Sequence, residues 1–377
     1  MKNKLNIIAA LDSFKGSLSS ADAGEAVRRG ILARYPDAQV TVFPVGDGGE
    51  GTAEALCLCH HAERHRITVT DTHGSPVTAE YGTAVVNGVR TAFLDMAAAA
   101  GIRYAEAHGL DLLRSSTFGV GECIRAILSD GGCGEIVMGL GGSGTNDGGI
   151  GALSALGGRF FRRDGSKIEM PVTASLFELA SCDLSVAKAL LQETKLTLLY
   201  DSGVPLIGPT GATELYSRQK GASEELIPKL ETAMIRYAGV CNSEAARMPG
   251  AGAAGGLGYG LSLIGGKLTP GADAVLSSIG FREAASQADA IFTGEGKTDR
   301  QTATGKLPLI VARHALGKPV ICLCGMAQPV AELYEAGIDA VFAIADGPMT
   351  FEESMAHTAQ LLEKAAFQFA GLLAKTL

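Results

Sequence analysis

The feature that most constrains this 377-residue chain is an alternation of strand-like and helical segments that stops and later resumes. Near the N-terminus, short apolar runs alternate with amphipathic stretches, at 5–11, 21–34, 40–44 and 50–61. This alternation is typical of a parallel sheet covered by helices. Beyond residue 64 the apolar period changes to two, and Asn87-Gly88 joins two alternating runs, which indicates a β-hairpin. A second domain is therefore expected to begin near residue 64.

The first pattern returns towards the C-terminus, where residues 288–293, 318–323 and 340–344 are strand-like and helical stretches follow them. We predict an α/β fold: a Rossmann-like, doubly wound parallel-sheet domain of residues 1–63 and 285–377, interrupted by an inserted α/β domain of residues 64–284 that contains the antiparallel hairpin. The alternative, two consecutive domains split near residue 190, would leave the first sheet with only two parallel strands. Within the inserted domain we expect strands at 135–140 and 195–200 and helices over 119–129, 149–157, 222–247 and 254–287.

Charge and hydropathy exclude several classes of protein. The 32 basic and 40 acidic residues give a formal net charge of −8, and 46% of the residues are hydrophobic. This composition argues against a disordered chain and against a nucleic-acid binder, which needs a basic surface. Eight scattered cysteines, several of them in apolar runs, predict reduced thiols in the cytoplasm. No apolar window is long enough to span a membrane. The sequence leaves open whether the chain forms a homodimer.

Loops that follow the expected strands of the first domain are rich in carboxylates, glycines and lysines, notably at 12–17, 46–52 and 294–299. Ligands of doubly wound sheets bind at the carboxyl ends of the strands. We therefore expect a site there, in the cleft between the two domains. Asp47 stands out because it lies among glycines between a strand and a helix, although an N-cap role would also explain it.

Two segments, 139–144 and 250–255, match the pattern G-x-G-x-x-G. The first follows a strand and precedes a helix, which suits a phosphate cradle. The following Thr145-Asn-Asp147 favours phosphate with Mg²⁺ over NAD, while a tight turn with an Asn or Asp cap stays open. Gly296-Lys-Thr298 resembles the end of a Walker A motif, but Ile291 replaces the required first glycine, which excludes a P-loop.

Seven blocks together resemble the bacterial glycerate kinase type-1 family, in the order of that family. They are 11–17 (LDSFKGS), 44–52 (PVGDGGEGT), 116–122 (STFGVGE), 139–149 (GLGGSGTNDGG), 219–222 (QKGA), 249–258 (PGAGAAGGLG) and 293–302 (TGEGKTDRQT). The resemblance implies ATP-dependent phosphorylation of D-glycerate to 2-phospho-D-glycerate with Mg²⁺, the 3-phospho product not being excluded. Val204 replaces the asparagine usual in the family, and Tyr216-Ser-Arg218 replaces Phe-Gly-Pro. The rival classes are an NAD(P)-dependent dehydrogenase of a small hydroxy acid and a non-catalytic phosphometabolite-binding regulator.

Phosphoryl transfer depends mainly on positioning and on neutralising charge, and this assigns expected roles to the residues of these blocks. Lys15, and after it Lys306, is expected to hold the glycerate carboxylate. Asp47 is expected to accept the hydroxyl proton, with Asp201 as its rival. Further substrate contacts are expected from Asp12, Ser13, Gln219 and Lys220. Phosphate contacts are expected from Gly48, Gly49, Gly141, Gly142, Ser143, Gly144, Asn146, Gly294 and Gly296, and Mg²⁺ ligands from Asp147, Glu295 and Asp299.

Overall fold

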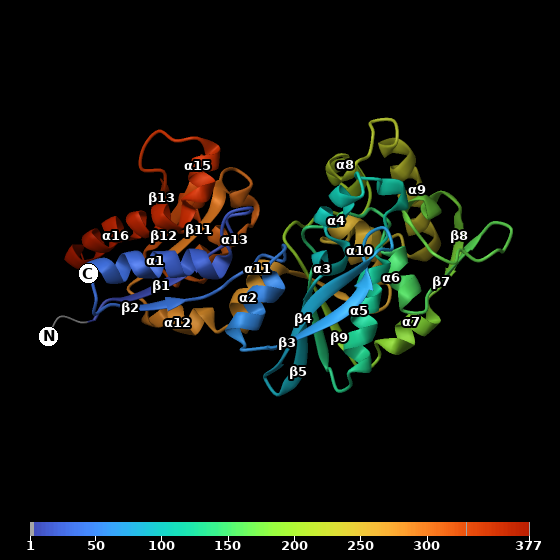
Figure 1. Ribbon diagram of the computed structural model, residues 1–377, viewed down its shortest axis with the longest axis horizontal. Helices are drawn as coiled ribbons and strands as arrows, with labels where there is room; N and C mark the ends of the chain where they lie inside the picture. Colours follow the sequence, from blue (N-terminus) through green and yellow to red (C-terminus); the bar gives the residue numbers. More distant parts are fainter. Residues whose placement is uncertain (1–3, 329, 377) are drawn as a thin grey trace. The chain divides into compact units, whose positions relative to one another are not determined.

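The computed structural model describes residues 4–328 and 330–376, and the chain divides into two compact units (Figure 1). Unit 1 is discontinuous, because it combines the residues up to Asp47 with those from Ala272 onward. Unit 2 is the continuous segment Gly48–Gly271.

The boundaries of the units differ from the expected ones at 63/64 and 284/285. Helix α2 (Thr52–Cys59) belongs to unit 2, where it packs against β4, β5 and β6. Most of α11 (Gly271–Ser278) and all of α12 (Phe281–Gln287) belong to unit 1, where Leu276 and Phe281 are fully buried in its core. Packing against a sheet, and not the periodicity of the helix itself, decides which unit each helix joins.

The sheet of unit 1 has five parallel strands in the order β13-β12-β11-β1-β2. They are β1 (Asn6–Leu11), β2 (Gln39–Val42), β11 (Ala290–Thr298), β12 (Val320–Ala327) and β13 (Ala340–Ala343). Numbered within the unit, the order is 2-1-3-4-5, which is the flavodoxin-like doubly wound order and not the 3-2-1-4-5 of the Rossmann fold. The strand order reverses between β1 and β11, so the switch point of the sheet lies there.

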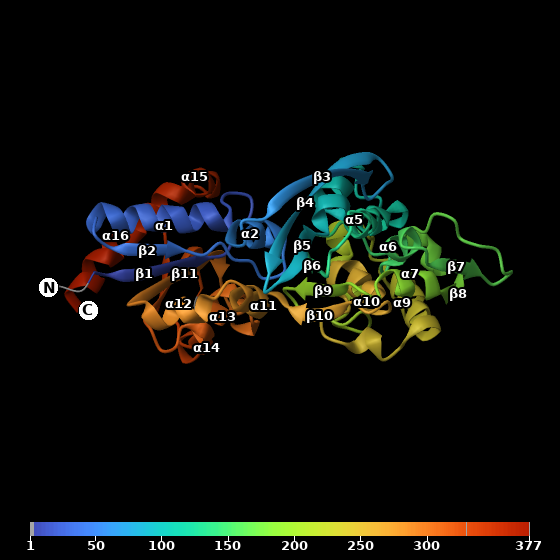
Figure 2. The same ribbon diagram turned by 90° about the horizontal axis from the view of Figure 1, so that it is seen from below.

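Helices cover both faces of this sheet (Figure 2). Along β1, Ile7, Ala9 and Leu11 face one layer, and Ile8 and Ala10 face the other, and all five are buried. Continuous burial of this kind is typical of a strand covered on both sides. The first layer contains α1 (Ser20–Arg34) and α16 (Thr358–Thr376), which pack against each other, and the second contains α11, α12, α13 (Leu307–His314) and α14 (Ala331–Glu335). Helix α15 (Phe351–Ala356) precedes α16.

Unit 2 contains a mixed sheet of six strands in the order β10-β9-β6-β5-β4-β3. They are β3 (Glu63–Thr70), β4 (Pro76–Val86), β5 (Val89–Asp95), β6 (Glu135–Gly139), β9 (Lys195–Tyr200) and β10 (Lys267–Pro270). The predicted hairpin is confirmed: β4 and β5 are antiparallel, and Asn87 and Gly88 both have positive φ at the turn. Strands β5, β6, β9 and β10 are parallel, so their carboxyl ends share one edge.

The remaining elements of unit 2 are short. They are α3 (Ala97–Ala100), α4 (Ile102–Ala107), α5 (Phe118–Ser129), α6 (Ile150–Ala155), α7 (Ser185–Leu190), α8 (Ala212–Tyr216), α9 (Ile227–Cys241), α10 (Leu257–Ser262) and a separate hairpin of β7 (Arg159–Arg162) and β8 (Leu179–Asp183). Between 254 and 287, where more helix was expected, the structure has α10, α11 and α12, and β10 lies between α10 and α11. Among the residues that the structure describes, no helix combines the length and the apolar character needed to cross a bilayer.

Candidate functional site

The switch point of unit 1 places two acidic side chains at neighbouring strands. Asp12 directly follows β1, and Glu295 lies in β11, next to Gly294, which pairs with Leu11. The Asp12 backbone N–H donates to the Gly294 carbonyl at 2.8 Å, which fixes the two loops against each other. Because ligands of doubly wound sheets bind at this point, Asp12 and Glu295 define the candidate site of unit 1.

Asp12 is a buried carboxyl group with one open oxygen. Its Oδ1 accepts the Ser13 backbone N–H at 2.7 Å, and its other oxygen accepts no hydrogen bond from the residues that the structure describes. Burial raises the pKa of Asp12 well above its usual value, and the charges of Asp47 and Glu295 raise it further, whereas Lys15 acts in the opposite direction. A buried carboxyl group with a raised pKa and an open oxygen is suited to accept a proton.

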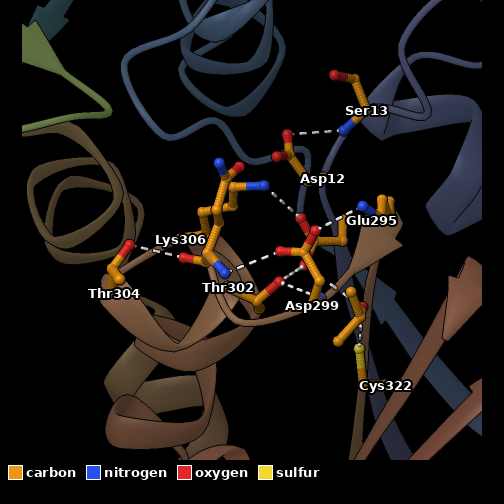
Figure 3. Close-up of polar contacts among 11 residues, drawn as sticks. Asp12, Ser13, Glu295, Asp299, Thr302, Thr304, Lys306 and Cys322 are labelled. Carbon is orange, nitrogen blue, oxygen red and sulfur yellow. Dashed lines mark hydrogen bonds and ion pairs between the residues drawn. The ribbon is translucent and has the colours of Figure 1, made fainter. Parts of the chain in front are cut away.

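Glu295 is held by donors from the end of β11 and from the segment after it. Thr302 Oγ1 donates to Glu295 Oε1 at 2.5 Å, Thr298 Oγ1 donates to it at 3.3 Å, and Lys306 Nζ lies 3.5 Å from Oε2 (Figure 3). Burial raises the pKa of Glu295 despite these partners. Lys306 is the residue that precedes α13, so the start of that helix positions its ammonium group beside the carboxylate.

The other predicted residues of unit 1 occupy less enclosed positions. Asp299 pairs with Lys297 at 2.8 Å and accepts the Gln301 backbone N–H. Lys15 is exposed, and Ser13 and Asp47 are half-buried. Gly294 is buried in the sheet, whereas Gly296 has open space around its Cα.

In unit 2 the glycine loop after β6 packs against the turn before α2. The Gly141 N–H donates to the Gly48 carbonyl at 2.9 Å, and a Cβ at Gly141 would lie 2.4 Å from the Cα of Gly49. The absence of side chains therefore allows two backbones to touch. Among the residues of these two segments that were predicted to contact phosphate, Gly48, Gly49, Gly144 and Asn146 are buried, whereas Gly141, Gly142 and Ser143 are accessible.

Lys220 holds this loop from within. Its Nζ donates to Ser143 Oγ at 2.7 Å and to the Thr145 carbonyl at 2.8 Å, and only 2% of the residue is exposed. Burial lowers the pKa of Lys220 to about 7, although the charge of Asp147 opposes the shift. Lys220 was predicted to contact substrate, and in the structure its ammonium group is buried against the glycine loop. Its neighbour Gln219 is exposed.

Asp147 does not fit its predicted role as a metal ligand. The residue is fully buried, and its carboxylate accepts the Thr117 N–H and Oγ1–H at 2.8 Å and the N–H groups of Gly149 and Gly151 at 2.9 and 3.2 Å. Burial raises the pKa of Asp147 despite these four donors. The carboxylate joins the start of α5 to the start of α6, which leaves no oxygen open to Mg²⁺.

Asp95 is a structural residue that the sequence analysis missed. Its two oxygens accept the backbone N–H groups of Gly51 and Ala53 at 2.8 and 3.0 Å. The carboxylate, at the end of β5, therefore caps the N-terminus of α2. Burial raises the pKa of Asp95 to about 7. An acidic residue directly after the short apolar run 92–94 was the available signal. Asp201, the predicted rival base, is exposed just after β9, at the same edge of the sheet.

The second glycine pattern, at 250–255, packs against the chain and is not a dinucleotide loop. A Cβ at Gly255 would lie 2.0 Å from the Thr145 carbonyl oxygen, and Gly255 in turn accepts the Gly148 N–H. The pattern therefore supports the first glycine loop from behind. In the described part of the chain, no three His, Cys, Asp or Glu side chains are grouped to hold a metal ion.

Comparisons with known proteins show the family of the chain. The sequence profile of the glycerate kinase family matches residues 7–374. The chain is 38% identical to a glycerate kinase of Bacillus subtilis (strain 168) over 99% of both chains, and 36% identical to the glycerate 2-kinase of Escherichia coli (strain K12) over 93% of both. The crystal structure of a protein assigned as glycerate kinase 2 from Salmonella typhimurium LT2 matches with a TM-score of 0.84 at 34% identity, over 99% of both chains. The chain therefore belongs to the glycerate kinase family.

Proposed function

We propose that this chain transfers the γ-phosphoryl group of ATP to the 2-hydroxyl of D-glycerate, giving 2-phospho-D-glycerate and ADP. Membership of the glycerate kinase family supports the kinase activity. The name of the Escherichia coli relative, glycerate 2-kinase, supports the choice of hydroxyl. The observation that carries the chemistry is the buried Asp12 carboxyl group, which has one open oxygen at the switch point of the unit 1 sheet.

In this proposal Asp12 replaces Asp47 as the acceptor of the hydroxyl proton. The raised pKa of Asp12 makes its carboxylate a stronger base, and the charge of Asp47 contributes to that rise. In this proposal Asp47 raises the pKa of Asp12 through its charge and does not contact the reacting proton.

Lys15 and Lys306 are proposed to bind the glycerate carboxylate. Lys15 is exposed four residues after β1, and Lys306 lies beside Glu295, whose charge it compensates. A carboxylate bound by two ammonium groups gains charge-assisted hydrogen bonds that are roughly twice as strong as neutral ones. In unit 2, Lys220 is proposed to fix the shape of the loop at Gly141–Ser143, so that its backbone N–H groups can bind phosphate.

Glu295 and Asp299 remain suitable ligands for Mg²⁺ by the chemistry of their oxygens, whereas Asp147 does not. Glu295 lies in β11 and Asp299 directly follows that strand, which fits the usual Mg²⁺ mode in which one or two carboxylates act together with phosphate oxygens. Bound there, Mg²⁺ would neutralise charge on the phosphoryl group.

An assay of ADP release tests the proposed activity. The purified chain is incubated with ATP, Mg²⁺ and D-glycerate, and ADP is coupled to pyruvate kinase and lactate dehydrogenase. We expect release that depends on D-glycerate. Formation of NAD(P)H from NAD(P)+ and glycerate without ATP would support the dehydrogenase instead, and binding of phosphometabolites without turnover would support the regulator.

A further inference from the structure

Two cysteines from distant parts of unit 2 meet at the surface. Cys182 lies in β8, and Cys241 is the last residue of α9, 59 positions later. Their sulfur atoms are 2.9 Å apart, less than 1 Å longer than the ~2.04 Å of a disulfide bond. Both residues are partly exposed, so small oxidants can reach them.

This accessibility distinguishes Cys182 and Cys241 from a second pair of neighbouring cysteines. Cys322 and Cys324 lie two positions apart in β12, and both are fully buried in the central part of the unit 1 sheet. Cys59 is partly exposed and lies in α2. Partial exposure and sulfur contact between separate elements therefore coincide at Cys182 and Cys241.

The surroundings favour the thiolate form at one sulfur of the pair. The hydrogen bond with Cys241 lowers the pKa of the Cys182 thiol, and the positive charge of Lys188 adds to this, whereas partial burial and Asp183 oppose it. The same hydrogen bond, together with burial, raises the pKa of Cys241. The thiolate is the reactive form of cysteine, so Cys182 is the nucleophile.

We propose that Cys182 and Cys241 form a modification site at which a hydroperoxide produces a reversible intramolecular disulfide. The Cys182 thiolate attacks the terminal oxygen of the hydroperoxide, the O–O bond breaks, and the departing oxygen is protonated to an alcohol or water. The resulting Cys182 sulfenic acid is attacked by the Cys241 sulfur. The S–O bond breaks, the S–S bond forms, and the hydroxide leaves as water with the Cys241 proton. The hydroperoxide gains the two electrons that the two thiols lose.

The disulfide would fasten α9 to the β7–β8 hairpin. These elements already pack together, so the bond needs little rearrangement. Four residues before Cys241, the buried Tyr237 packs against Gly148, just beyond the glycine loop. The disulfide bond would thus hold α9, which packs against the segment at Gly148. It would also consume the sulfenic acid before further oxidation to the irreversible sulfinic acid.

The test treats the full chain with a small excess of hydrogen peroxide and counts thiols after denaturation. We expect the count to fall from eight to six, a peptide map to show Cys182 linked to Cys241, and dithiothreitol to restore eight thiols. The melting temperature of the oxidised chain should rise by about 4–16 °C, because the cross-link restricts the unfolded chain. A count that stays at eight, a link between other cysteines, or a link between two chains would overturn the proposal.

Variants separate the roles of the two sulfurs. In Cys241→Ser, dimedone should trap a sulfenic acid at Cys182, and excess peroxide should convert Cys182 to a sulfinic acid. The matched control Cys59→Ser should form the disulfide as the parent chain does. Stronger trapping at Cys241 in Cys182→Ser than at Cys182 in Cys241→Ser would overturn the assigned nucleophile. The peptide map of the unsubstituted chain decides the proposal even if a variant fails to fold.

Discussion

The Lys220 ammonium group donates a hydrogen bond to the Ser143 hydroxyl at 2.7 Å, although 77 positions separate the two residues. The same ammonium donates to the Thr145 carbonyl, so one buried side chain fixes both ends of the segment Ser143–Thr145. This contact links the block at 219–222 with the glycine loop at 139–149. It explains why a lysine stands in a place where ligand cannot reach it.

Replacing Lys220 with methionine should loosen the glycine loop. Lys220→Met keeps the length of the side chain but leaves the Thr145 carbonyl without its donor, which typically costs ~1–3 kcal/mol of unfolding free energy. The KM for ATP should rise, while the KM for glycerate should change little. Urea denaturation and steady-state kinetics measure both effects, with the exposed Lys167→Met of the same unit as control. An unchanged free energy of unfolding and an unchanged KM for ATP would refute the positioning role.

Lys220 also predicts a pH dependence of stability. Its pKa is lowered to about 7 in the folded chain, whereas that of an unfolded lysine is ~10.4. Between these values the unfolded state binds more protons, so this group makes stability rise with pH from about 7 to about 10. The free energy of unfolding of the parent chain should therefore rise relative to that of Lys220→Met across this range. A constant difference would contradict the shifted pKa.

Asp95 predicts the same kind of effect at lower pH, with the opposite sign. Its folded pKa is raised to about 7 from an unfolded value of ~3.9, so the folded state binds more protons between these values. Stability should therefore fall, through this group, as pH rises from about 4 to about 7. Asp95→Asn should remove that part of the slope in denaturation curves measured across the range. The exposed Asp164→Asn serves as control and should leave the slope in place.

The roles of Asp12 and Asp47 can be separated by kinetics. Asp12→Asn should lower kcat by ~10²–10⁴, because it removes the proton acceptor. Asp47→Asn removes a negative charge that raises the pKa of Asp12, so the acidic limb of the pH profile of kcat/KM should move to lower pH while most of kcat persists. If instead Asp47→Asn loses as much kcat as Asp12→Asn, Asp47 is the base.

Lys15 predicts a selective loss of glycerate binding. Lys15→Ala removes a charge-assisted hydrogen bond, typically ~1.5–3 kcal/mol, which corresponds to roughly a 10- to 150-fold rise in the KM for glycerate. The KM for ATP should stay nearly constant, and Lys318→Ala, on the same unit, should change neither. A rise in the KM for ATP would place Lys15 at the phosphates.

The sequence predicted those features that depend on neighbouring residues. The period change after residue 64 and the Asn87-Gly88 turn gave the hairpin and the discontinuous parallel sheet. Strand order does not follow from periodicity, so the 2-1-3-4-5 order of unit 1 and its switch point beside Asp12 emerged only in the structure. Strand β10 was missed because its four residues end in proline and carry no alternating pattern.

Site chemistry that depends on distant residues could not be predicted. Asp147 looked like a metal ligand because its glycine-rich neighbours resemble a phosphate loop, but Thr117, 30 positions earlier, encloses it. The burial of Asp147 and Lys220 depends on packing between blocks that are far apart in the sequence. The resemblance of these blocks named candidate residues, and the structure shows the contacts that several of them make.

The central claim is transfer of phosphate from ATP to the 2-hydroxyl of D-glycerate, and phosphorus-31 NMR of the reaction mixture tests it most directly. With D-glycerate, ATP and Mg²⁺, the account predicts a phosphomonoester resonance that coincides with added 2-phosphoglycerate and couples to a single proton, on C2. A resonance that coincides with 3-phosphoglycerate and couples to the two C3 protons would contradict the assigned hydroxyl. The absence of any phosphoglycerate would contradict the proposed function.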